Sequence, residues 1–194
     1  MFAAWLVDLA RRVAEGIVTP LARLGVSPNA LTLAGFLLNL VTAVVISSGH
    51  LTWGGVLVLF SGAFDMLDGA LARVANKKTV FGAFFDSTMD RISEAALFFG
   101  VLLYYYQHGG SLLALTLTYV AVIGSLMVSY ARARAEGLGL ECKVGLFQRP
   151  ERVVALGLGL LLGRPALEIA IAALAIISSI TVVQRIAHIW RAAS

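Results

Sequence analysis

Four aspartates lie at the ends of two hydrophobic segments, within the stretch FDMLDGALARVANKKTVFGAFFDSTMDR. Asp65 and Asp68 are three residues apart in the sequence, and Asp86 and Asp90 are four residues apart. On a helix, either spacing places two side chains on one face. Clustered carboxylates repel one another and are costly in a membrane, and bound divalent cations such as Mg²⁺ relieve both problems. The pattern therefore favours a metal site formed by two neighbouring helices.

The same aspartates have a second interpretation, as membrane-interface carboxylates that pair with nearby basic residues. Those candidate partners are Arg73, Lys77, Lys78 and Arg91. Charge alone does not separate the two interpretations, but two glycines favour the metal site. Gly69 and Gly82 remove side chains beside the acidic cluster, so that a ligand or another backbone can approach closely. Glu94 is expected to pack in the bundle or to pair with Arg91.

The segment 65–90 resembles the signature of the CDP-alcohol phosphotransferase family, D-x2-D-G-x2-A-R-x8-G-x3-D-x3-D. Every fixed position of that signature is filled, in order, by Asp65, Asp68, Gly69, Ala72, Arg73, Gly82, Asp86 and Asp90. The resemblance implies transfer of a phosphatidyl group from CDP-diacylglycerol to an alcohol, with release of CMP. It also implies a membrane enzyme that forms a homodimer, as members of the family do.

By the family pattern, the aspartates are expected to bind two Mg²⁺ ions, and Mn²⁺ would also suit them. Asp65, Asp68 and Asp86 would be shared ligands, and Asp90 would contribute to the second ion. Asp90 is also the expected general base, which accepts the proton of the acceptor hydroxyl. Paired metal ions with a nearby base are suited to displacement at phosphorus.

The resemblance also implies which residues contact the CDP-lipid. Gly69 is expected to permit close approach of the nucleotide, and Arg73 to bind its pyrophosphate, whose oxygens suit the guanidinium fork. A predicted helix N-terminus near residue 28 would offer free N–H groups to a phosphate. The remaining expected contacts are Pro28, Asn29, Ala30, Leu31 and Thr79.

Arginines in the second half of the chain bear on the identity of the alcohol. The runs SYARARAE, RPER and QR resemble bacterial phosphatidylinositol-phosphate synthases. By that likeness, Arg132, Arg152 and Arg185 would bind the phosphate of inositol 1-phosphate, although the family often has lysine at the position of Arg132. Side chains that merely extend to the membrane interface would explain the same arginines without a ligand. Glycerol 3-phosphate is also an anionic alcohol, so phosphatidylglycerophosphate synthesis is the alternative reaction.

Composition indicates an integral membrane protein. The chain has 194 residues, of which 59% are hydrophobic and 13% are charged, and its mean hydropathy is +0.88. A soluble domain carries about a quarter charged residues. We expect an all-α membrane domain over 1–194, with an amphipathic interfacial helix at 1–25 and a bundle at 29–187. The six predicted spans are 29–48, 52–74, 81–106, 111–134, 150–163 and 166–187.

The distribution of positive charge predicts the orientation in the membrane. Of the 15 lysines and arginines, only Arg164 falls on the second side of a six-span arrangement. The positive-inside rule then places both termini and the aspartates on the cytoplasmic side of the cell membrane. The aromatic residues lie in apolar segments and not among the basic residues, so no nucleic-acid partner is expected.

A cation transporter is the non-enzymatic alternative, because intramembrane acids often mark ion paths. That alternative predicts acids near the middle of the membrane and broken or repeated spans. Here the acids stay on one side, and the sequence shows no repeat.

Overall fold

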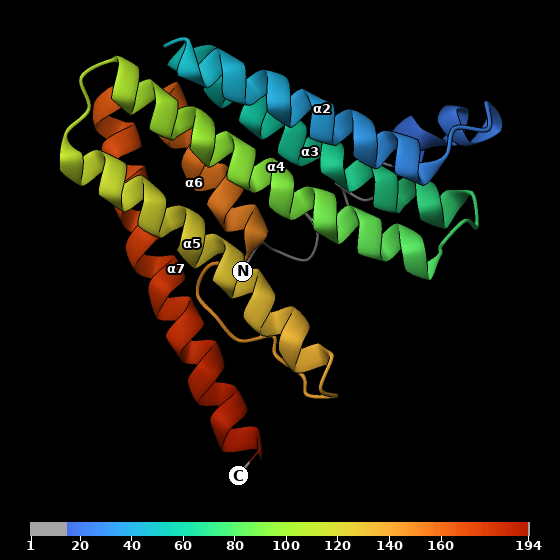
Figure 1. Cartoon of the computed structure of the whole chain (residues 1–194). Coiled ribbons are helices and arrows are strands. Elements are labelled where there is room, and N and C mark those ends of the chain that lie inside the picture. The colour runs from blue at the N-terminus through green and yellow to red at the C-terminus, as the bar shows by residue number, and fades with distance from the viewer. Residues whose placement is uncertain (1–14, 194) are drawn as a thin grey trace.

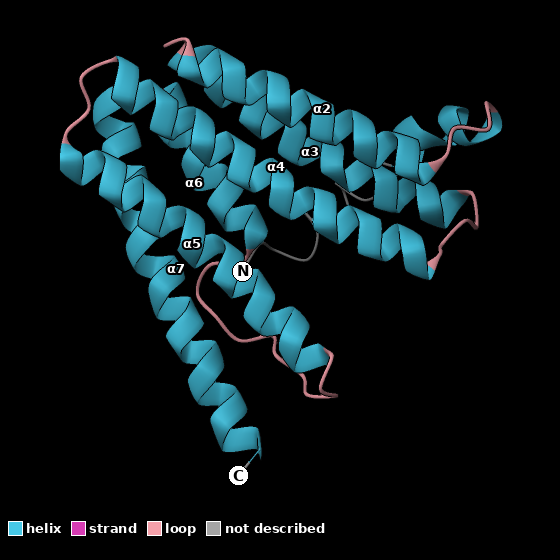
Figure 2. Cartoon of the chain, in the orientation of Figure 1, coloured by secondary structure: helices cyan, strands magenta, loops and turns pink. Residues whose placement is uncertain are grey.

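The structure, a computed structural model, describes residues 15–193. Within this range every regular element is a helix and no strand is present (Figure 2). A short helical segment at 15–23 precedes the longer helices (Figure 1). These are α2 (Pro28–Ser47), α3 (Leu51–Val74), α4 (Val80–Gln107), α5 (Leu112–Glu136), α6 (Arg149–Leu161) and α7 (Arg164–Ala193). The all-α prediction is confirmed.

Four of these helices, α2, α3, α5 and α7, are long and apolar enough to cross a membrane. The charged residues of α4 interrupt its apolar run, and α6 has only 13 residues. The helix bounds agree with the predicted spans to within a few residues, except that α7 extends to Ala193. Most of the predicted interfacial helix, residues 1–14, lies outside the described residues.

Local sequence explains where two of the helices begin. Ser27 caps α2, and its hydroxyl accepts a hydrogen bond from Ala30 N at 3.2 Å. Thr79 caps α4 in the same way, by accepting from Gly82 N at 2.9 Å. Both are residue types that satisfy free N–H groups at a helix start. Between α3 and α4, Asn76 has a φ of 51°, which asparagine tolerates better than most residues.

The helices are tied together at one end of the bundle and diverge at the other. α2 packs on α3 and α4, α5 packs on α7, and α6 lies between α3 and α7. Arg164 donates to the carbonyl oxygens of His108 and Gly109, at 3.0 and 2.9 Å, and so ties the α6–α7 turn to the α4–α5 turn. Toward the opposite end, α5 and α7 diverge from α4 (Figure 1). That divergence leaves room for a polar site.

Glycines allow the helices that carry the aspartates to meet backbone to backbone. A Cβ at Gly55 would lie 2.6 Å from Leu161 N, where α3 meets α6. A Cβ at Gly100 would lie 2.6 Å from Ala43 O, where α4 meets α2. Small residues at such crossings are the usual means of close packing between membrane helices. These contacts hold α6 close to α3, and α2 close to α4.

Candidate active site

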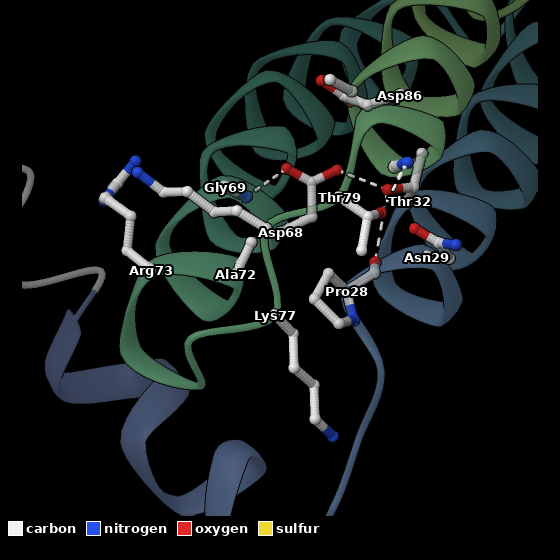
Figure 3. A pocket seen from close by; sticks show the side chains of 13 residues that line it. Pro28, Asn29, Thr32, Asp68, Gly69, Ala72, Arg73, Lys77, Thr79 and Asp86 are labelled. Carbon is white, nitrogen blue, oxygen red and sulfur yellow. Dashed lines mark hydrogen bonds between the residues drawn. The ribbon is translucent and has the colours of Figure 1, made fainter.

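Asp68 and Asp86 line one cavity of about 260 Å³, which is bounded by α2, α3 and α4. Asp68 is buried, and its carboxylate accepts a hydrogen bond from Thr32 Oγ1 at 2.7 Å (Figure 3). Asp86 comes from α4 and lies close enough to Asp68 and Asp90 for their charges to interact. Thr32 thus holds one carboxylate oxygen of Asp68 from a third helix.

Asp65 and Asp90 are bridged by an arginine from α6. Arg149 Nη2 lies 2.6 Å from Asp65 Oδ2 and 2.8 Å from Asp90 Oδ1. Arg91 lies 3.3 Å from the other oxygen of Asp90. On the α2 side, a Cβ at Gly35 would come within 3.0 Å of Asp65 Oδ1, so glycine makes space for this carboxylate. The structure therefore brings α3, α4 and α6 together at the aspartates.

The four aspartates provide a donor set that suits a hard divalent cation, because all of their ligand atoms are carboxylate oxygens. Asp90 interacts electrostatically with both Asp65 and Asp68, so the two pairs form one acidic cluster. In the described part of the chain, no group of three or more acidic, histidine or cysteine side chains is arranged to hold a metal ion as it stands. In this arrangement Arg149 Nη2 contacts one oxygen of Asp65 and one oxygen of Asp90.

Most of the predicted CDP-lipid contacts line the cavity beside Asp68. The predicted residues that line it are Pro28, Asn29, Gly69, Arg73 and Thr79. Ala30 and Leu31 do not line it, and Leu31 instead packs in a buried apolar cluster with Leu71. Cavity residues beyond the predicted set are Thr32, Ala72, Lys77, Lys78, Gly82 and Ala83. Thr32 follows Pro28 by four residues, so the helical period could have identified it.

The two glycines of the acidic segment have different roles. A Cβ at Gly69 would meet nothing closer than Arg73 Nη1 at 3.6 Å, which is an ordinary contact. Packing within the chain therefore does not require glycine there, and its effect is to keep the cavity open. A Cβ at Gly82 would lie 2.9 Å from Thr79 Oγ1, so Gly82 is required by the cap of α4.

A second cavity, of about 380 Å³, lies where α4, α5, α6 and α7 diverge. All three predicted acceptor arginines line it, and two further arginines do so as well. The five are Arg91, Arg132, Arg149, Arg152 and Arg185, and we call this space the arginine cavity. Because Arg149 also contacts Asp65 and Asp90, this cavity adjoins the aspartates.

Arg152 forms a buried, two-pronged ion pair with a carboxylate of α4. Its side chain is 2% exposed, and its Nε and Nη2 donate to the two oxygens of Glu94 at 2.7 and 3.0 Å. Glu94 is buried, as the packing alternative predicted, but its ion-pair partner is Arg152, 58 residues away in the sequence, and not the predicted Arg91. Helical spacing identifies partners on the same helix, and it cannot identify one that α6 supplies.

The other two predicted arginines are oriented differently. Arg185 is buried and donates to the carbonyl oxygens of Val128 and Val144. Arg132 donates from Nε to Glu136 on its own helix, at 2.8 Å. The three predicted arginines thus reach the same cavity from α5, α6 and α7, and Arg91 reaches it from α4.

Comparisons with known proteins identify a family for this arrangement. Residues 25–190 match the family described as CDP-alcohol phosphatidyltransferase. The phosphatidylinositol phosphate synthase of Corynebacterium glutamicum is 42% identical over 188 residues, with 91% of this chain and 85% of that protein covered. The archaetidylinositol phosphate synthase of Methanothermobacter thermautotrophicus is 37% identical over 186 residues, with 93% and 92% covered.

The fold is also similar to solved structures of the Mycobacterium tuberculosis phosphatidylinositol phosphate synthase. The crystal structure with CDP-DAG bound has a TM-score of 0.87 at 35% identity, and covers 92% of this chain and 94% of that one. The complex with manganese and citrate has a TM-score of 0.82 at 34% identity, and covers 93% and 88%.

Proposed function

The chain belongs to the CDP-alcohol phosphatidyltransferase family, and on that premise we propose that it makes phosphatidylinositol phosphate. The phosphatidyl group of CDP-diacylglycerol passes to the hydroxyl of inositol 1-phosphate, and CMP is released. One observation carries the choice of acceptor: five arginines line a cavity that adjoins the aspartates. Arginine is the residue type best suited to bind a phosphate, so an acceptor that itself carries a phosphate fits this cavity.

The chain's own residues divide the work of binding and proton transfer. The open cavity at Gly69 holds the cytidine diphosphate, and Arg73 at its edge binds the pyrophosphate. Asp90, the aspartate that contacts both Arg91 and Arg149 of the arginine cavity, accepts the proton of the acceptor hydroxyl. The oxygen of that hydroxyl bonds to phosphorus as the bond from phosphorus to CMP breaks.

Asp65, Asp68, Asp86 and Asp90 are the proposed ligands of two Mg²⁺ or Mn²⁺ ions. When bound, such ions neutralise charge on the phosphate oxygens and on the departing CMP. Thr32 would orient Asp68 for ligation, because its hydroxyl donates to one Asp68 oxygen while the backbone N–H of Gly69 donates to the other. The relative crystallised with manganese supports a divalent-metal requirement.

The acceptor phosphate binds to Arg132, Arg152 and Arg185 in this proposal. Arg185 is the strongest candidate for direct charge pairing, because no carboxylate forms an ion pair with it among the described residues. Glu94 already pairs with Arg152, and it aligns that side chain along the cavity wall.

We further propose that α4 and α6 join the four apolar helices as membrane spans, giving one six-span domain in the bilayer of the cell membrane. The aspartates and both termini then lie on the cytoplasmic side. Arg164 lies at the opposite end of the bundle, at the turns beside His108, which supports this orientation. A homodimer is proposed by analogy with the family.

The test is a CMP-release assay with the purified chain, CDP-diacylglycerol and Mg²⁺. Inositol 1-phosphate is expected to support release, and kcat/KM with glycerol 3-phosphate is expected to be at least about tenfold lower, as loss of polar acceptor contacts predicts. A preference for glycerol 3-phosphate would reject the proposed acceptor. No CMP release with either alcohol would reject the transfer reaction itself.

A further inference from the structure

Arg149 contacts two aspartates of the acidic cluster and also lines the arginine cavity, whereas Arg91, which lines the same cavity, contacts Asp90 alone. It is the first residue of α6. Through Nη2 alone it reaches Asp65 on α3 and Asp90 on α4. No role was predicted for it from the sequence.

The guanidinium of Arg149 is less completely bonded than those of Arg152 and Arg185 in the same cavity. Its Nε is buried and has no hydrogen-bond partner. Arg152 in contrast binds both oxygens of Glu94, and Arg185 binds two carbonyl oxygens. The side chain of Arg149 is 23% exposed, against 2% for Arg152. Arg149 therefore has unused donors and room to turn.

The two carboxylates that Arg149 holds are also proposed metal ligands. An oxygen lone pair that accepts from a guanidinium is not free for a cation, so the two interactions compete. If Asp65 and Asp90 turn to ligate cations, Arg149 loses both partners and leaves a desolvated charge, which is costly unless an anion replaces them. The arginine cavity that it already lines is where an acceptor phosphate would supply that anion.

We propose that Arg149 is a further acceptor-binding residue, and that it couples the two sites by exchanging the carboxylates of Asp65 and Asp90 for the acceptor phosphate. This inference rests on the proposed function, because it takes the acceptor to be phosphorylated. Binding of the acceptor then tightens metal binding, and metal binding tightens acceptor binding by the same factor, as linkage requires.

The experiment measures Mn²⁺ binding to the full-length chain in detergent by electron paramagnetic resonance, with and without saturating inositol 1-phosphate. CDP-lipid is omitted, so the readout does not depend on turnover. In the parent chain, inositol 1-phosphate is expected to tighten Mn²⁺ binding. In Arg149→Gln, Mn²⁺ is expected to bind roughly fivefold more tightly without acceptor than in the parent chain. Addition of inositol 1-phosphate is then expected to leave the Mn²⁺ affinity of this variant nearly unchanged.

Arg132→Gln is the matched control, because it removes an equal charge from the same cavity but from a residue paired with Glu136. Its Mn²⁺ affinity without acceptor is expected to stay within about twofold of the parent chain. Unchanged Mn²⁺ affinity in Arg149→Gln would overturn the proposal, as would equal tightening in the control. Failure of inositol 1-phosphate to tighten Mn²⁺ binding in the parent chain would overturn it too. The proposed reaction is judged separately, by CMP release.

Discussion

The aspartates of the cluster differ in their surroundings, and the surroundings suggest their roles. Asp68 is buried and held by Thr32, and so has the most fixed position. Asp65 and Asp90 share Arg149, which places them beside the arginine cavity. Asp86 lines the cavity that we propose for the nucleotide. In the proposed function, a single acidic cluster therefore faces the nucleotide on one side and the acceptor on the other.

Replacement of Asp90 tests the assignment of the general base. Asp90→Asn keeps the size of the side chain but removes the proton acceptor, so kcat for CMP release is expected to fall by at least about 100-fold. CDP affinity, measured by calorimetry, is expected to change little because Asp90 does not line the nucleotide cavity. Glu168→Gln, which removes a carboxylate at the far end of the bundle, is the control. Parent-like turnover in Asp90→Asn would exclude Asp90 as the base.

The hydrogen bond from Thr32 gives a second prediction. Thr32→Val removes a support of a proposed metal ligand, and such changes weaken metal affinity by about 10- to 100-fold. Thr42→Val is a matched control on the same helix, because Thr42 donates only to the backbone oxygen of Leu38. Mn²⁺ titration should show weakening in Thr32→Val alone. Equal Mn²⁺ affinity in the two variants would contradict the role of Thr32.

The sequence predicted the residues of the site better than it predicted their partners. The aspartates and most cavity residues follow from spacing and from the family signature. Thr32, Gly35 and Arg149 meet the aspartates only because α2 and α6 pack against α3, and no spacing rule within one helix reports such contacts. Glu94 shows the same limit, because its partner Arg152 comes from α6.

At the scale of the elements, α6 is the shortest of the six labelled helices, and through Arg149 it connects the acidic cluster to the arginine cavity. Its first turn carries Arg149 and Arg152, and its far end meets α3 at Gly55. The predicted span at 150–163 is close to the observed helix, because proline and glycine signals bound it. How far α6 lies from α3 could not be predicted, since it depends on which glycines face each other.

Gly55→Ala tests that close approach. The added Cβ would lie 2.6 Å from Leu161 N and 2.7 Å from Gly157 O, and backbone atoms cannot move aside as a flexible side chain can. The cost is about 1–3 kcal/mol of unfolding free energy. A lower thermal midpoint is expected in detergent, with a higher KM for the acceptor because α6 shifts. Gly16→Ala, which meets nothing within 4 Å, should match the parent chain. A parent-like midpoint in Gly55→Ala would contradict the close α3–α6 packing.

At the scale of the whole molecule, the bundle is tied at the Arg164 end and diverges at the polar end. That shape places both cavities at one end of the bundle, which in the proposed orientation is the membrane face where a water-soluble alcohol and a membrane-bound donor can meet. The composition of the sequence predicted a helical membrane domain. The divergence of α5 and α7 from α4 (Figure 1) depends on side-chain packing across the bundle, and periodicity carries no information about it.

Cysteine labelling in intact cells tests the orientation. In a Cys142→Ser background, which removes the buried native thiol, single cysteines replace Lys78 and Gln107. A membrane-impermeant maleimide is expected to label Gln107→Cys from outside, and to label Lys78→Cys only after permeabilisation, because positive loops stay in the cytoplasm. Labelling in the reverse pattern would place the aspartates on the outer face.

The most direct measurement of the central claim is the number of Mn²⁺ ions that the purified chain binds, counted by electron paramagnetic resonance. The parent chain is expected to bind two ions, and asparagine at position 65, 68, 86 or 90 is expected to weaken binding by at least about tenfold, because carboxylates supply the charge that holds a hard cation. A parent chain that binds no Mn²⁺, or four variants that bind it as the parent does, would contradict a metal site formed by α3 and α4.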